Sequence, residues 1–225
     1  MNTILIDTHV HTSEVSSCGK VSAKDMVNYY KKAGYDGVII TDHYYDGFFE
    51  RLSCDRWADK ADCYLSGYRA ALEEGNKIGL KVYLGMELRF EGSLEDYLIY
   101  GIDEEYIIEN PELYKHSLES FKESIKGTDI FIVQAHPFRK GLKVADPALL
   151  DGVEVMNGNP RHDSHNDLAF SFASKHGLMM TAGSDAHQPE DVGCCGIRVS
   201  KNISTSKELA QLMRESNSYE LYIPR

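Results

Sequence analysis

Short apolar runs, each followed directly by histidine or carboxylate residues, are the feature of this sequence that most constrains its fold. We call each such group of histidine and carboxylate residues a packet. Five packets begin at Asp7, Thr41, Glu87, His136 and Ser184. Longer amphipathic stretches separate the apolar runs, and this alternation is typical of βα units around a largely parallel sheet. The carboxyl ends of parallel barrel strands meet on one face, so we expect the packets to converge there.

The periodicity places the individual elements. Strands are expected near residues 4–7, 37–41, 81–86, 97–102, 130–135, 152–156, 178–182 and 196–199. Helices are expected over 22–34, up to 78, and over 111–126, 147–150, 163–175 and 205–215. About seven βα units follow, close to the repeat count of a TIM-type barrel. No linker or internal repeat interrupts the chain, so residues 1–225 are expected to form a single α/β domain, a distorted TIM-like (β/α)7 barrel.

Composition narrows the class of partner. The formal net charge of −11 argues against a general nucleic-acid-binding surface but not against a small anionic substrate held by cations. No apolar run is long enough to cross a bilayer, so no membrane partner is expected. The N-terminus lacks the basic and apolar regions of a signal peptide, and a cytoplasmic location is therefore expected. The oligomeric state is left open.

The cysteines fit a reducing compartment. They are odd in number and have no zinc-ribbon spacing, which favours free thiols; they are Cys18, Cys54, Cys63, Cys194 and Cys195. Cys18 lies close in sequence to the first histidine packet. A bystander role is favoured for it over a metal ligand.

Two packets carry the strongest metal signal. His9 and His11 are two residues apart, and on a strand such residues share a face. Imidazole is the commonest protein ligand for transition metals. Asp185 and His187 offer a carboxylate and an imidazole at the same spacing. Glu87 is a candidate metal ligand because it lies at a predicted strand end, where a carboxylate can bridge two cations.

The other polar residues allow two interpretations each. Asp42, before His43, either orients a liganding ring or caps a turn. Arg139 and Arg161 follow strands whose ends should face the site, so they are candidate phosphate clamps as well as candidate exposed arginines. For His162 and His165, contact with the substrate and exposure on the surface are both kept as interpretations. No catalytic role is expected for His116 or His176.

In their order along the chain, the motifs HxH, TDH, GxE, HP and SDAH resemble those of the PHP (polymerase and histidinol phosphatase) superfamily, from Asp7 to His187. The resemblance implies a distorted (β/α)7 barrel with two or three divalent metal ions, zinc, manganese or iron, at the strand ends. It also implies a hydrolase that cleaves a small phosphorylated substrate.

The resemblance also implies a set of ligands. It assigns one metal to His9, His11, Glu87 and Asp185, a second to His43 and His187, and a third to Glu87 and His136. Asp7 and Asp42 would support ligands without binding metal. Where members often carry a further ligand, this chain offers Glu14 after the first packet and Asp103 after the fourth strand.

The expected reaction is hydrolysis of a phosphomonoester by a water molecule that paired cations activate. Two alternatives are kept. One is an amidohydrolase-type enzyme that cleaves a C–N bond on a similar barrel, although no lysine stands at a strand end to be carbamylated as in that class. The other is a non-catalytic metal-binding module.

Overall fold

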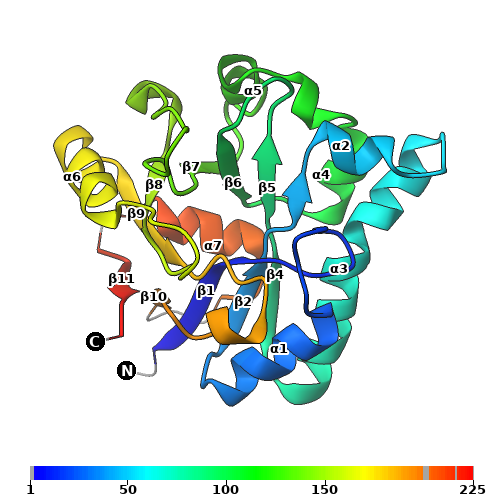
Figure 1. Ribbon diagram of the computed structural model, residues 1–225, viewed down its shortest axis with the longest axis horizontal. Coiled ribbons are helices and arrows are strands. Elements are labelled where there is room, and N and C mark those ends of the chain that lie inside the picture. Colours follow the sequence, from blue (N-terminus) through cyan, green and yellow to red (C-terminus); the bar gives the residue numbers. More distant parts are fainter. Residues whose placement is uncertain (1–2, 200–202, 216, 225) are drawn as a thin grey trace.

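The strands form two sheets that share one barrel. The computed structural model describes residues 3–199, 203–215 and 217–224 (Figure 1). The first sheet has the order β11 (Tyr219–Tyr222), β10 (Gly196–Val199), β1 (Ile4–Val10), β2 (Gly37–Ile40) and β4 (Lys81–Leu84). The second has the order β3 (His43–Tyr44), β5 (Met86–Arg89), β6 (Asp96–Tyr100), β7 (Phe131–Gln134), β8 (Gly152–Asn157) and β9 (Met179–Gly183).

Backbone hydrogen bonds join the two sheets at both edges. On one side the His11 amide donates to the Ala186 carbonyl over 3.0 Å, which brings β1 against the end of β9. On the other side the Glu87 amide donates to the Asp42 carbonyl over 3.1 Å. Around the barrel the order is β1, β2 with β3, β4 with β5, β6, β7, β8 and β9. The expected distorted seven-position TIM-like barrel is confirmed.

Within the barrel, two features depart from the predicted parallel arrangement; beside it, β10 runs antiparallel to β1 and β11. Strand β6 runs antiparallel to both β5 and β7, with Leu98 opposite Glu87 on one side and Val133 on the other. The predicted strand 81–86 is divided at Gly85 between the two sheets. A Cβ atom at Gly85 would lie 2.8 Å from Ile39 Cγ2, so the close approach of the neighbouring strand leaves no room for a side chain.

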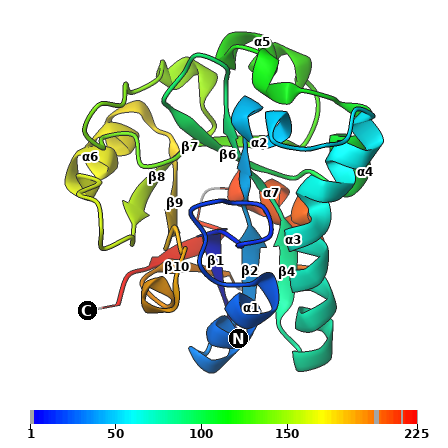
Figure 2. The same cartoon turned by 45° about the vertical axis from the view of Figure 1, so that its right-hand side comes forward.

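Helices cover the outside of the barrel. They are α1 (Ala23–Lys32), α2 (Asp46–Glu50), α3 (Trp57–Ile78), α4 (Glu104–Glu109), α5 (Leu118–Ser124), α6 (Asn166–His176) and α7 (Ser206–Met213). Short 3₁₀ turns occur at η1 (Leu113–Lys115), η2 (Pro147–Leu149) and η3 (Pro189–Asp191). Helices α1 and α3 pack together, while α6 packs on β8 (Figure 2). Helix α4 was not predicted, and the single helix predicted over 111–126 is η1 followed by α5.

The aromatic segment after β2 belongs to the core. Tyr44, Phe48 and Phe49 are buried and pack against Tyr64 of α3. This cluster fixes the start of β3 and therefore the position of His43. Among the described residues, no helix combines the length and the apolar character needed to cross a membrane.

Candidate metal centre

The two histidines at the end of β1 direct their Nε2 atoms to one point. The Nδ1 atom of His9 lies 2.8 Å from Glu154 Oε1, and a carboxylate can only accept, so this nitrogen is the donor. Ser16 Oγ donates to Asp42 and therefore accepts from His11 Nδ1 over 3.1 Å. The Nε2 atoms of both rings therefore face each other, 3.0 Å apart.

Glu87 occupies the centre of the cluster. Strand β5 pairs in parallel with β3 and sets Glu87 opposite His43. The Glu87 carboxylate lies 3.3 Å from His9 Nε2, 3.4 Å from His11 Nε2 and 3.2 Å from His136 Nε2. Its Oε2 atom is 2.6 Å from His43 Nδ1. One carboxylate in van der Waals reach of four imidazoles suits a bridging ligand.

The late loops bring a second carboxylate to the same point. Asp185 Oδ1 lies 3.3 Å from His11 Nε2 and 3.6 Å from His9 Nε2. The His187 Nδ1 atom donates to the Asp185 carbonyl over 2.8 Å, which leaves its Nε2 free. Asp185 and His136 have positive φ angles of 53° and 30°. Such conformations are costly for non-glycine residues and cluster at functional sites.

The donor set fits a cation. In three groups, one ligand atom from each residue lies within 4.8 Å of the others: His11, His43 and His187; His9, His11 and Asp185; and His43, Glu87 and Asp96. Glu87 Oε2 and His136 Nδ1 are buried and make no hydrogen bond among the described residues. Buried polar atoms without partners are rare. Imidazole and carboxylate donors that converge in this way fit divalent transition metals.

The pKa values of His9 and His11, the two histidines of the first packet, are shifted in opposite directions. Burial opposes charge on His9, but Glu154, Asp185 and Glu87 outweigh it and raise its pKa well above the usual value. Burial, with His187 and His43 nearby, lowers the pKa of His11 well below its usual value. Burial disfavours the charged form of Glu87, yet His43 and His9 lower its pKa. The cluster therefore holds ionised carboxylates that favour positive charge at His9 and a neutral imidazole at His11; a bound cation would supply that positive charge in place of the proton on His9.

Asp7 and Asp42 lie behind the ligands. Asp7 is buried and accepts from the amides of His9 and Ser184 and from the Tyr30 hydroxyl. Asp42 accepts from the amide and hydroxyl of Thr12 and from Ser16. Burial raises the pKa of each carboxyl to about 6. Both residues position the loops that carry His9, His11 and His43.

Sequence reasoning missed Glu154. It lies on β8, is completely buried, and accepts from His9 Nδ1 and from the His136 amide over 2.9 Å. A carboxylate that holds the second nitrogen of a ligand histidine fixes its tautomer and orientation. The available signal was a single glutamate inside the apolar segment Gly-Val-Glu-Val-Met.

The prediction of Glu14 as a ligand is wrong. Its side chain is exposed, and both carboxylate oxygens accept from the Ala23 amide, at 3.0 and 2.9 Å. Ala23 is the first residue of α1, where free amides and the helix dipole attract a carboxylate. Glu14 therefore caps a helix. Cys18, four residues later, lines the cavity instead.

The prediction of Asp103 as a ligand is also wrong. Because β6 is antiparallel, its carboxyl end faces away from the other strand ends, and Asp103 caps α4 by accepting from the Tyr106 amide. The beginning of the same strand reaches the site. Asp96 lies there, buried and paired with Arg89 at 2.8 Å, beside His43 and Glu87.

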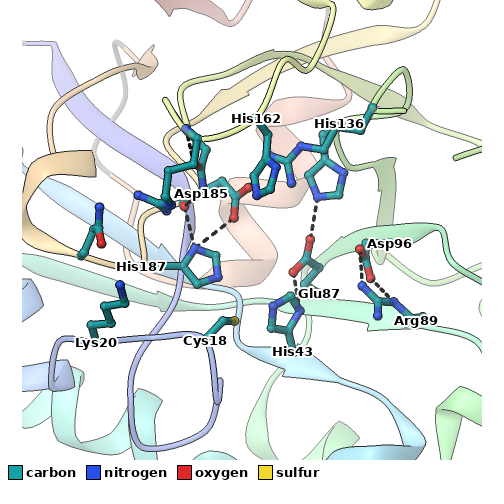
Figure 3. Close-up of a pocket in the computed structure, with 14 residues that line it drawn as sticks. Cys18, Lys20, His43, Glu87, Arg89, Asp96, His136, His162, Asp185 and His187 are labelled. Carbon is teal, nitrogen blue, oxygen red and sulfur yellow. Dashed lines mark hydrogen bonds and ion pairs between the residues drawn. The ribbon is translucent and has the colours of Figure 1, made fainter. Parts of the chain in front are cut away.

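A cavity of about 230 Å³ opens over the cluster (Figure 3). Its lining residues are Cys18, Lys20, His43, Glu87, Arg89, Asp96, His136, Arg139, Asn159, Arg161, His162, Asp185, His187 and Gln188. Seven predicted ligands meet at or beneath it, namely His9, His11, His43, Glu87, His136, Asp185 and His187. His162 borders it, whereas His165 is exposed beside Asp163.

The two predicted clamp arginines reach the cavity but are engaged by protein carboxylates. Arg139 donates to Asp185 Oδ2 over 2.6 Å, and Arg161 pairs with Asp191. Asp191 also accepts from the amide of His187. Lys20 lines the same cavity, and within 3–199, 203–215 and 217–224 no side-chain partner is found for its ammonium group.

Comparison with known proteins places this geometry in a family. The family model described as PHP domain matches residues 7–184, and a second, described as PHP-associated, matches residues 163–218. No curated protein sequence matches the chain.

Solved structures share the fold at low sequence identity. A two-domain protein from Bacteroides vulgatus ATCC 8482, described as containing a predicted PHP-like metal-dependent phosphoesterase, has a TM-score of 0.71 and 17% identity over 99% of this chain. This chain spans 65% of that protein. PsfC from Pseudomonas syringae PB-5123 has a TM-score of 0.68 and 20% identity, covering 100% of this chain and 93% of its own. An amidohydrolase from Chromobacterium violaceum, with bound sulfate and no metal, has a TM-score of 0.55 and 18% identity over 84% of this chain and 89% of its own. Because the PHP domain match covers most of the sequence, the chain belongs to the PHP domain family.

Proposed function

We propose that this protein is a metal-dependent phosphoesterase that hydrolyses a small phosphomonoester with two or three divalent cations. The observation that carries the proposal is the group of histidine Nε2 atoms that converge on two ionised carboxylates, Glu87 and Asp185. The ligand-forming loops lie in both matched segments, so we propose that residues 1–225 act as one catalytic domain.

The geometry supports two adjacent groups of ligands around Glu87. His9, His11 and Asp185 form the deeper group, and His43 and His187 lie nearer the opening. His136 and Asp96 approach Glu87 and His43 from the other side and would complete a third group. Zinc, manganese and iron all accept such imidazole and carboxylate ligands.

The chain's own residues would prepare the reaction. Bound divalent cations supply Lewis acidity and lower the pKa of water. Glu154, Asp7 and Asp42 hold the ligands at fixed positions, which removes the cost of reorganising them during the reaction. Arg139 holds Asp185 through a hydrogen bond of 2.6 Å and also donates to Asn157.

The rim supports recognition of an anion. Arg89, Arg139 and Arg161 each neutralise a carboxylate, so Lys20 is the cation best able to meet a phosphate group directly. His162 and Gln188 line the same opening and add hydrogen-bonding groups. A cavity of about 230 Å³ suits a phosphate and a small leaving group.

The test is phosphate release by the full chain after loading with manganese, zinc or ferrous iron. A panel of small phosphomonoesters is compared with a panel of amides and lactams. We expect metal-dependent hydrolysis of phosphomonoesters, abolished by a chelator and restored by metal. Hydrolysis of amides or lactams alone would overturn the proposal in favour of a C–N hydrolase.

The two alternatives have weaker support. Lys20 is the lysine among the cavity-lining residues, and it lies in the loop after β1 and not at a strand end, where the carbamylated lysine of amidohydrolase-type sites is expected. A non-catalytic module would need no open cavity over its metal ligands, whereas this site has one lined by cations. Binding of fewer than two equivalents of metal after loading would favour that module.

A further inference from the structure

Strand β8 brings two polar side chains together, those of Glu154 and Asn157, although the residues stand three positions apart. On a regular strand, residues at that spacing point to opposite faces. Glu154 pairs with Thr181 of β9 and Met156 pairs with Ala182, so β8 holds one extra residue between the two pairs (Figure 1). Such a bulge redirects the side chains that follow it. Asn157 therefore reaches Glu154, and its Nδ2 group donates to Glu154 Oε2 over 2.9 Å.

The Asn157 side chain is buried and uses both ends of its amide. Its Nδ2 group also donates to Asp185 Oδ2 over 3.3 Å. Its Oδ1 atom accepts from Arg139 over 2.8 Å and from the Asn159 amide over 3.1 Å. Because a carboxylate only accepts and a guanidinium group only donates, these neighbours fix which end of the amide faces the carboxylates. An aspartate has the same shape but would bring an acceptor where a donor is needed.

The contact with Asn157 holds one oxygen of Asp185 away from the proposed metal. Asp185 Oδ2 accepts from both Asn157 and Arg139, the latter over 2.6 Å. The other oxygen, Oδ1, is directed to the imidazoles and lies 3.3 Å from His11 Nε2. Asp185 also has a φ angle of 53°, a conformation that persists only where the surroundings enforce it. Hydrogen bonds to Oδ2 therefore help to aim Oδ1 at the cation.

The same amide reaches two histidines through Glu154. Glu154 Oε2, which accepts from Asn157, also accepts from the His136 amide over 2.9 Å. The other oxygen of Glu154 lies 2.8 Å from His9 Nδ1. Two buried acidic side chains, Glu154 and Asp185, thus share one NH₂ group. Because asparagine is neutral, it gives both of them a donor without neutralising the charge that attracts a cation.

We propose that Asn157 is a positioning residue that joins Asp185 to Glu154 and so keeps the proposed ligands His9, His136 and Asp185 in fixed relative positions. Removing the amide would leave two buried carboxylate oxygens short of a donor, which is costly. The inference rests on the proposed metal centre. It assigns part of the geometry of that centre to a residue that lies behind the ligands.

The zinc affinity of the full chain, measured by competition with a chromophoric chelator, tests the proposal. Asn157→Asp keeps the shape of the side chain, adds a negative charge and removes the donor. Charge alone would strengthen zinc binding, whereas the positioning role predicts binding about 10- to 100-fold weaker. The control is Asn166→Asp at the start of α6, which adds the same charge, removes a donor to the Asn157 carbonyl and should leave zinc affinity unchanged. Wild-type or tighter zinc binding by Asn157→Asp would overturn the proposal.

A second variant and a spectrum distinguish positioning from a general loss of structure. Asn157→Leu has a similar size and no hydrogen-bonding group, and it should also weaken zinc binding. Bound cobalt(II) absorbs visible light in a pattern that depends on the geometry of its ligands. We expect both Asn157 variants, saturated with cobalt, to differ from the wild type in their visible spectra and Asn166→Asp to match it. Wild-type spectra in both Asn157 variants would contradict the positioning role.

A double-mutant cycle tests the link through Glu154. If Asn157 acts partly through Glu154, the combined loss of zinc affinity in Glu154→Gln with Asn157→Leu should be smaller than the product of the separate losses. Losses that multiply would show that the two residues act independently and would contradict the link.

The outcomes separate the inference from the proposed function. Zinc affinity that neither Asn157 variant changes would overturn the positioning role and leave the metal centre standing. A wild-type protein that binds neither zinc nor cobalt would overturn both. Weakened zinc binding and altered cobalt spectra in the variants of a protein that hydrolyses no phosphomonoester would support the role of Asn157 and contradict the reaction.

Discussion

The parallel and antiparallel parts of the barrel bring candidate metal ligands to the site in opposite ways. In the parallel part, each strand places its carboxyl end at the cavity, as β1 does with His9 and β9 does with Asp185 just beyond it. Strand β6 runs the other way, so its first residue, Asp96, reaches the site and the residue after its end, Asp103, does not. Strand direction, more than residue type, decides which carboxylates can act as ligands.

The largest effect is expected at Glu87, where the two parts meet. Glu87→Gln removes the charge that lies within 3.4 Å of His9, His11 and His136. We expect phosphatase activity to fall by more than the roughly 10- to 100-fold typical of losing a partner behind a ligand. Steady-state kinetics and metal analysis would measure it. Full activity with full metal content would show that Glu87 does not bridge two metal ions.

A substitution at Glu154 tests how far the hydrogen bonds behind His9 and His136, in the parallel part, contribute to metal binding. Glu154→Gln cannot accept at both oxygens, whereas Glu154 accepts from His9 on one and from the His136 amide on the other. Metal affinity should fall about 10- to 100-fold. Isothermal titration with zinc provides the measurement. A conservative control is Glu190→Gln, at an exposed position of η3, which should leave affinity unchanged.

Asp96 and Asp103 form a matched pair across β6. Asp96→Asn should lower metal affinity and activity about 10-fold, because its carboxylate borders His43 and Glu87. Asp103→Ala should leave activity intact and cost about 1 kcal/mol of stability by removing the cap of α4. Kinetics and urea unfolding distinguish the two. The reverse result would mean that β6 runs parallel to its neighbours.

Gly67 tests how closely α3 packs beneath the first ligand loop. A Cβ atom there would lie 2.2 Å from Thr12 Oγ1 and 2.7 Å from Asp42 Oδ2. We expect Gly67→Ala to destabilise the protein by about 1–2 kcal/mol net, since overpacking exceeds the gain in helix propensity. Ser66→Ala, at the exposed neighbouring position, is the control. A stabilised Gly67→Ala variant would contradict this packing.

Much of the fold was predictable because periodicity and helix caps are local signals. The start of α1 lies where the helix over 22–34 was expected, and the Ser22 side chain caps it by accepting from the Asp25 amide. The reversal of β6 was not predictable, because a strand's apolar pattern is the same in either direction. That missing direction explains both the omission of Asp96 and the choice of Asp103.

The site was predictable where a motif stands at a parallel strand end. Glu154 was missed because a lone carboxylate inside a strand carries no spacing signal. Glu14 was predicted as a ligand for its residue type, but its carboxylate accepts from the amide at the start of α1. Competition between a helix terminus and a metal for the same carboxylate depends on loop geometry, which local sequence does not specify.

Anomalous diffraction from crystals of the metal-loaded protein tests the central claim most directly. The account predicts at least two metal peaks under the cavity, with Glu87 between them and with His9, His11, Asp185, His43 and His187 as ligands. Asp96 should lie beside a peak, and Asp103 should lie at the opposite end of β6. A single peak away from Glu87, or no peak after loading, would contradict the account.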